Sequence, residues 1–193
     1  MLPKILEMAQ DENHVVFTRG YYNLNIIGLR SKNEEANSFD DKMFVVFKVP
    51  GDTWVELCFK VTTDPGKYWL NNPMRVSGSA ILCPGQYRGV YKIDGHGKTK
   101  YEALCQRNGK VRVYRDSNKD EILDHDPDSI EEGYFGINIH RASSKRESSA
   151  VEKWSAGCQV FADPSDFELF MALCRISSKK YGNSFTYTLL EEK

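Results

Sequence analysis

The sequence predicts a mostly β domain with one or two packing helices, an α+β fold overall. Short runs rich in β-branched and aromatic residues recur along the chain, and Pro-Gly, Asp-Pro-Gly and Asn-Gly turns separate them. Only two segments space their apolar residues as a helix would. The length of 193 residues, 40% of them hydrophobic, suffices for one domain with a full core.

The expected strands follow one another through most of the chain. They are Met43–Val49, Trp54–Val61, Gly89–Ile93, Val111–Tyr114, Tyr134–His140, Gln159–Ala162 and Phe185–Leu190. Turn-forming segments at Pro50-Gly51, Pro84-Gly85 and Asn108-Gly109 lie between them. This spacing of short strands and turns favours an all-β core.

Two helices are expected beside the strands. Residues 1–10 place Leu2, Ile5, Leu6 and Ala9 on one helical face. The second helix begins at Asp163, a residue that caps helix N-termini, followed by Pro164, which suits the first turn. Its apolar residues follow i, i+3, i+4, i+7 spacing, which predicts a face packed on the core: Phe167, Phe170, Met171 and Cys174.

We expect residues 1–40 to form an N-terminal extension packed on the core and residues 41–193 to form the main domain. The net charge of −1, with acidic and basic residues interspersed, argues against a nucleic-acid partner. No apolar run approaches the length of a membrane span. Because residues 1–10 lack the apolar core of a signal peptide, we expect synthesis and folding in the cytoplasm.

Five cysteines are scattered along the chain: Cys58, Cys83, Cys105, Cys158 and Cys174. Their odd number and wide spacing are not typical of a disulfide framework or a zinc knuckle. Cys158 alone follows a glycine, in the segment Trp154-Ser-Ala-Gly-Cys158, and it lies 18 positions after His140. A thiol needs a base to become a good nucleophile, and imidazole is the usual one. Gly157 lets a substrate carbonyl approach backbone N–H donors.

This arrangement resembles the catalytic domain of the L,D-transpeptidases, in which a histidine and a variable loop precede a Ser/Thr-x-Gly-Cys motif. Cys83-Pro-Gly-Gln-Tyr87 is similar, more weakly, to the family's Thr-Pro-x-Gly-x-Phe/Tyr segment. The resemblance covers roughly residues 43–162. The chain also resembles uncharacterised bacteriophage proteins, through the segments 62–66, 136–140 and 154–161.

The resemblance implies a β-sandwich-like fold, with residues 41–193 as the catalytic domain. It implies that Cys158 attacks a carbonyl of a peptidoglycan stem peptide while His140 takes the thiol proton. The N–H groups of Gly157 and Cys158 would stabilise the oxyanion. The chemistry needs no cofactor. This chain has Ala156 and Val160 where the family commonly has a histidine and an Arg or Asn.

In the family, the residues at these two positions help to hold the peptide substrate. We therefore expect substrate contacts from Asn138, Arg141 and Gln159, together with Trp154 and Ser155 beside the cysteine. Three functions stay open: an L,D-transpeptidase, a murein L,D-endo- or carboxypeptidase, and a non-catalytic phage structural or wall-binding module. A buried cysteine beside a hydrogen-bonded histidine is the purely structural alternative. An enzyme of the first two kinds would act at the cell wall after release at lysis or as part of a virion.

A second candidate site lies in the acidic segment 116–127. Oxygen-bearing side chains stand at i, i+2, i+4 and i+8, namely Asp116, Asn118, Asp120 and Asp124. This spacing resembles the start of a calcium loop and predicts a structural calcium ion. Glu121 replaces the usual glycine, and a solvated acidic loop is the alternative. His96 and His125 are each single histidines in polar segments, and we expect both to be exposed.

Overall fold

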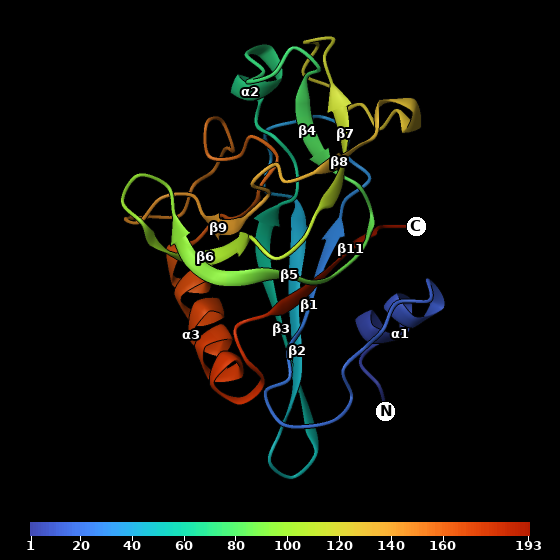
Figure 1. Cartoon of the computed structure of the whole chain (residues 1–193), viewed down its shortest axis with the longest axis vertical. Helices are drawn as coiled ribbons and strands as arrows, with labels where there is room; N and C mark the ends of the chain where they lie inside the picture. The colour runs from blue at the N-terminus through green and yellow to red at the C-terminus, as the bar shows by residue number, and fades with distance from the viewer.

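Eight strands close into a barrel in the computed structural model, which describes residues 1–193 (Figure 1). In spatial order they are β1 (Asn25–Arg30), β11 (Phe185–Glu191), β5 (Gly85–His96), β6 (Tyr101–Gln106), β9 (Ile139–Arg141), β10 (Gln159–Phe161), β3 (Thr53–Thr62) and β2 (Asp41–Val49). A separate antiparallel sheet contains β4 (Ser79–Leu82), β7 (Val111–Asp116) and β8 (Glu131–Gly133). The helices are α1 (Lys4–Asp11), α2 (Lys67–Asn71) and α3 (Pro164–Tyr181), with a 3₁₀ turn at Pro127–Ser129.

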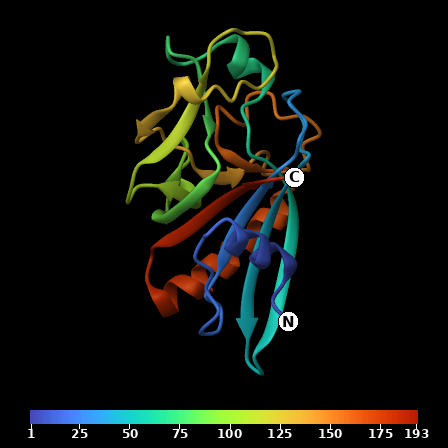
Figure 2. The same cartoon turned by 90° about the vertical axis from the view of Figure 1, so that its right-hand side faces the viewer.

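The two sheets occupy opposite parts of the molecule. Figures 1 and 2 both show the three-stranded sheet and α2 at one end of the barrel, with the β2–β3 hairpin extending from the other end. Two further helices, α1 and α3, lie beside the barrel (Figure 1). None of the helices combines the length and the apolarity that crossing a membrane would require.

The prediction of a mostly β fold with few helices is confirmed, but the β-sandwich was wrong. The sheet closes because β1 and β11, from opposite ends of the chain, pair in parallel, with Ile26 opposite Tyr187. β1 also pairs with β2, and β11 with β5, so neither strand is left as an open edge. A sandwich would have kept two open sheets face to face.

β1 was absent from the expected strands because all six of its residues are buried and none alternates with a polar neighbour. Ile26 packs in the main core, whereas Ile27 and Leu29 contact the apolar face of α1. Gly28 is required by close packing, since a Cβ there would lie 1.9 Å from the Tyr187 hydroxyl. The boundary expected at residue 40 therefore does not coincide with the structural one, because the barrel begins at Asn25.

α3 forms where the sequence predicts it. The Asp163 carboxylate accepts a hydrogen bond from the Ser165 N–H at 2.7 Å, and Pro164 takes the first helical position. The four apolar residues expected on its inner face are all buried in the main core, where Phe161 of β10 stacks near Phe167 and Phe170. This packing fixes β10 against α3.

Two three-residue strands carry the candidate site. β9 is shorter than the strand expected over residues 134–140, and it pairs in parallel with β10. The register places Gln159 opposite Ile139 and Val160 opposite His140. Ile139 packs into the main core, whereas Val160 packs in a separate cluster that Cys158 also contacts. The short parallel pair thus divides its side chains between the main core and the smaller buried cluster that Cys158 contacts.

Candidate active site around Cys158 and His140

Cys158 lies immediately before β10 and is half-buried. The preceding Gly157 has a φ of 114°, a backbone conformation that other residues rarely adopt. A Cβ at this position would lie 2.2 Å from the carbonyl oxygen of Ala80 in β4. Position 157 therefore requires glycine for two reasons: the backbone conformation of the turn and the close approach of the three-stranded sheet.

Ser155 holds this turn from within. Its hydroxyl donates to the carbonyl of Cys158 at 2.8 Å and accepts the N–H of Gly157 at 3.1 Å. Its own carbonyl accepts the Gly66 N–H, and the side chain has no exposed surface. Ser155, which was expected to contact substrate, therefore stabilises the turn instead.

These bonds leave one oxyanion donor instead of the expected two. The Gly157 N–H is engaged by Ser155, whereas the Cys158 N–H donates to no other atom of the chain. A carbonyl oxygen bound beside Cys158 would meet that unpaired N–H.

The Cys158 thiol is held by backbone groups. Its Sγ donates to the Gly136 carbonyl and accepts the Asn138 N–H, both at 3.4 Å. Burial raises the pKa of this thiol to about 11, although the Asn138 N–H opposes the rise. In the resting state the sulfur is therefore a protonated thiol at neutral pH.

His140 is almost fully buried and neutral. Burial first, and then neighbouring His96, lower its pKa to about 3. Its Nδ1 lies 2.8 Å from the Arg141 carbonyl oxygen, which accepts a hydrogen bond and so assigns the proton to Nδ1. Nε2 is then the nitrogen whose lone pair is free to accept a proton.

The parallel register brings Cys158 and His140 together on one face. Val160 is opposite His140, and Cys158 precedes Val160 by two residues, the repeat of an extended chain. Side chains two residues apart in an extended segment point the same way, so the thiol and the imidazole share the face opposite to that of Ile139, which packs in the main core. No hydrogen bond joins Sγ to the imidazole, because the thiol bonds Gly136 instead.

His96 is part of the site, and the expectation that it would be exposed was wrong. Its ring stacks on His140 with centroids 4.1 Å apart and an interplanar angle of 21°. Its Nδ1 lies 3.0 Å from Nδ2 of Asn138. The sequence places His96 in a polar segment, and only the β5–β6 hairpin carries it to His140.

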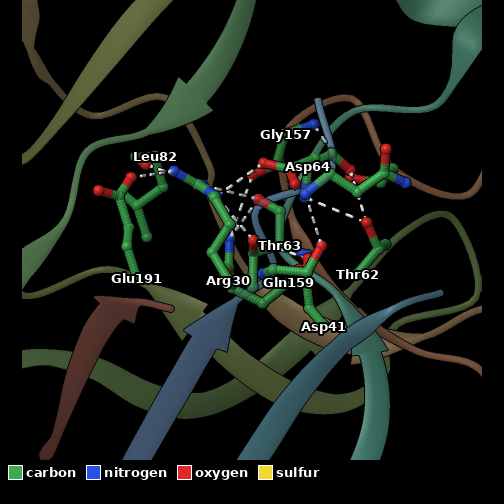
Figure 3. Close-up of polar contacts among 12 residues, drawn as sticks. Arg30, Asp41, Thr62, Thr63, Asp64, Leu82, Gly157, Gln159 and Glu191 are labelled. Carbon is green, nitrogen blue, oxygen red and sulfur yellow. Dashed lines mark hydrogen bonds and ion pairs between the residues drawn. The ribbon is translucent and has the colours of Figure 1, made fainter. Parts of the chain in front are cut away.

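Asn138 and Gln159, expected to bind substrate, are buried and bonded within the barrel. The Asn138 Oδ1 accepts the N–H of Gln106 at 2.9 Å, while its Nδ2 faces His96. The Gln159 Nε2 donates to the Thr63 carbonyl at 3.3 Å (Figure 3), and its Oε1 accepts the Tyr187 hydroxyl at 2.8 Å. Both amides thus join strands, and neither has a free group for a ligand.

Arg141 and Trp154 lie nearer the surface. The Arg141 guanidinium stacks over the Tyr101 ring at 4.0 Å and reaches Glu168 at 3.9 Å. Trp154 is 45% exposed and lines an open hollow of about 570 Å³ with residues 143 and 146–150. Of the five expected substrate contacts, Trp154 is the most accessible to a ligand.

A smaller pocket beside the turn was not expected from the sequence. It measures about 50 Å³ and reaches Ala156, two residues before Cys158. Phe135 forms one wall, with the guanidinium groups of Arg75 and Arg115 at 5.3 and 4.6 Å from its ring. Met74, which also lines it, is largely exposed. Exposed apolar and cationic groups beside the cysteine suit a peptide with carboxylates.

The acidic loop brings its expected ligands close together. The Asn118 Nδ2 lies 2.9 Å from Asp120 Oδ2 and 2.7 Å from Asp124 Oδ2, and Asp116 accepts the Asp124 N–H. Burial raises the pKa of Asp116 to about 6. No three His, Cys, Asp or Glu side chains converge here, or elsewhere, in an arrangement suited to a metal ion. Calcium binding stays a prediction.

Comparison with known proteins finds no match for this chain. No family model, no curated protein and no solved structure matches the chain.

Proposed function

We propose that this protein is a cysteine acyl-transfer enzyme of the L,D-transpeptidase type, acting on peptidoglycan stem peptides. One observation carries the proposal: the parallel β9–β10 register places Cys158 on the same face as a neutral His140 whose Nε2 is free. A thiol and a neutral imidazole on one face of a strand pair are the groups that nucleophilic acyl transfer requires.

The reaction begins with a peptide carbonyl bound at the Cys158 N–H, the donor left unpaired by the chain. Rotation of the Cys158 side chain releases Sγ from Gly136, and His140 Nε2 takes the thiol proton. The C–S bond then forms and the C–N bond breaks, and His140 returns the proton to the leaving amine. An acceptor amine gives transpeptidation and water gives hydrolysis. In either case His140 removes the acceptor's proton as the new C–N or C–O bond forms, the C–S bond breaks, and that proton returns to the Cys158 sulfur.

The raised pKa of Cys158 and the lowered pKa of His140 define the form of catalysis. The resting pair is uncharged, so proton transfer accompanies attack instead of preceding it. The imidazolium and the oxyanion of the bound carbonyl then form together in a poorly hydrated site, where each stabilises the other. This is general-base catalysis and not the use of a preformed ion pair.

Ala156 and Val160 leave the substrate to be held by other groups. We propose that the stem peptide runs between the hollow beside Trp154 and the pocket at Ala156, which are lined by residues of the same turn. Arg75, half-exposed in that pocket, supplies a cation for a peptide carboxylate. An enzyme with this substrate would act at the wall after lysis or from a virion.

The proposal is tested by incubating the protein with purified peptidoglycan and analysing the fragments by mass spectrometry. New cross-links support transpeptidation, and trimmed stems support an L,D-endo- or carboxypeptidase. Cys158→Ala should abolish either change, whereas Cys58→Ala, at an exposed cysteine of β3, should not. Unchanged peptidoglycan would contradict both enzymes.

A wall-binding module is the second candidate, favoured by the hydrogen bond that Cys158 makes to Gly136 in place of His140. A module of this kind would sediment with peptidoglycan and leave its composition unchanged. Its binding would also be the same for Cys158→Ala, which separates it from the enzyme.

A further inference from the structure

A second pocket, away from Cys158, lies where β1 and β11 end. It has a volume of about 370 Å³, and every residue that lines it is polar or charged. These are Arg30, Ser31, Lys32, Asn33, Glu34, His125, Glu191 and Glu192. None of them belongs to the Cys158–His140 site. An all-polar hollow is suited to a small hydrophilic ligand.

Arg30 forms the buried wall of this pocket, with a side chain only 3% exposed. Its Nε donates to the Thr63 hydroxyl at 3.0 Å and its Nη2 to the Leu82 carbonyl at 3.0 Å. Figure 3 shows the guanidinium between Glu191 on one side and Thr63 and Asp64 on the other. Nη1 has no hydrogen-bond partner, since Glu191 is 3.7 Å away. Nη1 of this buried cation is therefore left without a hydrogen bond, in a residue that lines the pocket.

His125 supplies a second unsatisfied group on the same pocket. Its ring packs against Tyr114 with centroids 5.3 Å apart, and its buried Nε2 has no partner. Contrary to the expectation from sequence, His125 is half-buried. A ligand oxygen between Arg30 Nη1 and His125 Nε2 would satisfy both nitrogens.

The surrounding charges determine which ligand fits. Arg30 and Lys32 face three carboxylates, those of Glu34, Glu191 and Glu192. Asp64 lies 3.0 Å behind Arg30 and already balances its charge. A plain anion would be repelled by this excess of carboxylates, whereas a plain cation would leave Nη1 unpaired. A ligand with both charges satisfies both parts of the pocket.

We propose that the pocket binds a free α-amino acid, with its carboxylate on Arg30 Nη1 and His125 Nε2 and its ammonium group on Glu34 and Glu191. Glu192 is less available because it pairs with Lys42 at 3.2 Å. The α-amino and carboxylate groups of an amino acid are separated by one carbon, so one molecule spans the cationic wall and the acidic rim. The inference is independent of the chemistry proposed for Cys158.

The test uses the full-length protein and measures melting temperature and then calorimetric titration. The probes are glycine, the other common L-amino acids and D-alanine, each at about 10 mM, because stabilisation grows with the ratio of ligand to Kd. Sodium acetate and methylammonium chloride at the same concentration supply each charge alone. At least one amino acid should raise the melting temperature, and neither salt should match it. No shift with any amino acid, or an equal shift with acetate, would overturn the proposal.

Variants locate the binding. Glu191→Gln, at a half-exposed side chain, should weaken the affinity for the selected amino acid at least about tenfold, a loss of about 1.4 kcal/mol. His125→Phe should weaken it as well. Glu132→Gln, exposed on β8 of the other sheet, is the matched control and should leave the affinity unchanged. Equal affinity of Glu191→Gln and the unmodified protein would place binding elsewhere and reject this site.

Discussion

The Nδ1 atom of His140 lies 2.8 Å from the carbonyl oxygen of Arg141, the residue that follows it in β9. This short-range bond makes the imidazole a donor at Nδ1, and Nε2 is then the nitrogen that can accept a proton. The same residues thus fix both the position and the proton of the ring. The stacked His96 keeps the ring in an environment where the charged form is disfavoured.

The reactivity of Cys158 should follow the ionisation of a buried thiol. With a pKa of about 11, its thiolate fraction rises about tenfold per pH unit below that value. We expect the rate of iodoacetamide labelling in the absence of substrate to rise about tenfold per unit between pH 7 and 10. Peptide mass spectrometry measures each cysteine separately, and fully buried Cys174 reports unfolding. A rate that levels off below pH 8 would indicate a preformed thiolate.

The lowered pKa of His140 should make the protein less stable in acid. Between pH 6.5 and about 3 the unfolded chain binds a proton at His140 that the folded protein does not, so stability is present above 6.5 and lost as pH falls. At pH 5 the loss is about 2 kcal/mol relative to pH 7. Urea unfolding at both pH values measures this contribution as a difference: from pH 7 to pH 5 the unmodified protein should lose about 2 kcal/mol relative to His140→Gln.

Burial raises the pKa of Asp41 to about 7 and that of Asp116 to about 6. Because the folded protein then binds protons at these carboxyls more readily than the unfolded chain does, they raise its stability as the pH falls, opposite to the effect of His140. Both carboxyls are present in the variant, so their effect cancels in the comparison. An identical pH dependence for the two proteins would show that His140 is not kept neutral by the fold.

Gly157→Ala should destabilise the protein by about 3 kcal/mol or more, because it combines an unfavourable φ with overlap on a backbone carbonyl. Gly97→Ala is the matched control, since Gly97 also has a positive φ, of 65°, but open space around it. The control should lose only about 1 kcal/mol. Similar losses measured by urea unfolding would mean that the contact with Ala80 is relaxed easily.

Calcium should raise the melting temperature if the acidic loop binds it. Removing a charge in Asp124→Asn should abolish the rise, because Asp124 is one of the four side chains grouped in the loop. Glu132→Gln should keep it. The absence of any shift at about 1 mM calcium, the weak end of the range for calcium modules, would leave the segment as a solvated acidic loop.

The sequence predicted those parts of the fold whose cause is local. The α3 helix follows from Asp163, Pro164 and the apolar spacing after them, all within one segment. β1 could not be predicted in this way, because its burial on two faces depends on α1 and on β11, which lies over 150 residues later. Closure of the sheet into a barrel could not be predicted either, because it depends on the same pairing between strands far apart in the sequence.

The residues of the site also divide into those that a local motif predicts and those that depend on distant parts of the chain. Its thiol, its imidazole and its glycine stand in a short motif that indicates their chemistry. Asn138 and Gln159 are polar residues beside that motif, and their sequence positions say nothing of Gln106, Thr63 or Tyr187, which take up their hydrogen bonds. His96 reaches the site through the pairing of two strands, and no local pattern predicts that pairing.

The parallel pairing of β1 with β11 has a consequence for synthesis of the chain. β11 begins at Phe185, so its partners β1 and β5 keep unpaired edges until residues 185–191 have left the ribosome. Closure of the barrel therefore waits for its last strand, which pairs with its first. A truncation before Phe185 would leave two adhesive strand edges and favour aggregation over a smaller folded domain.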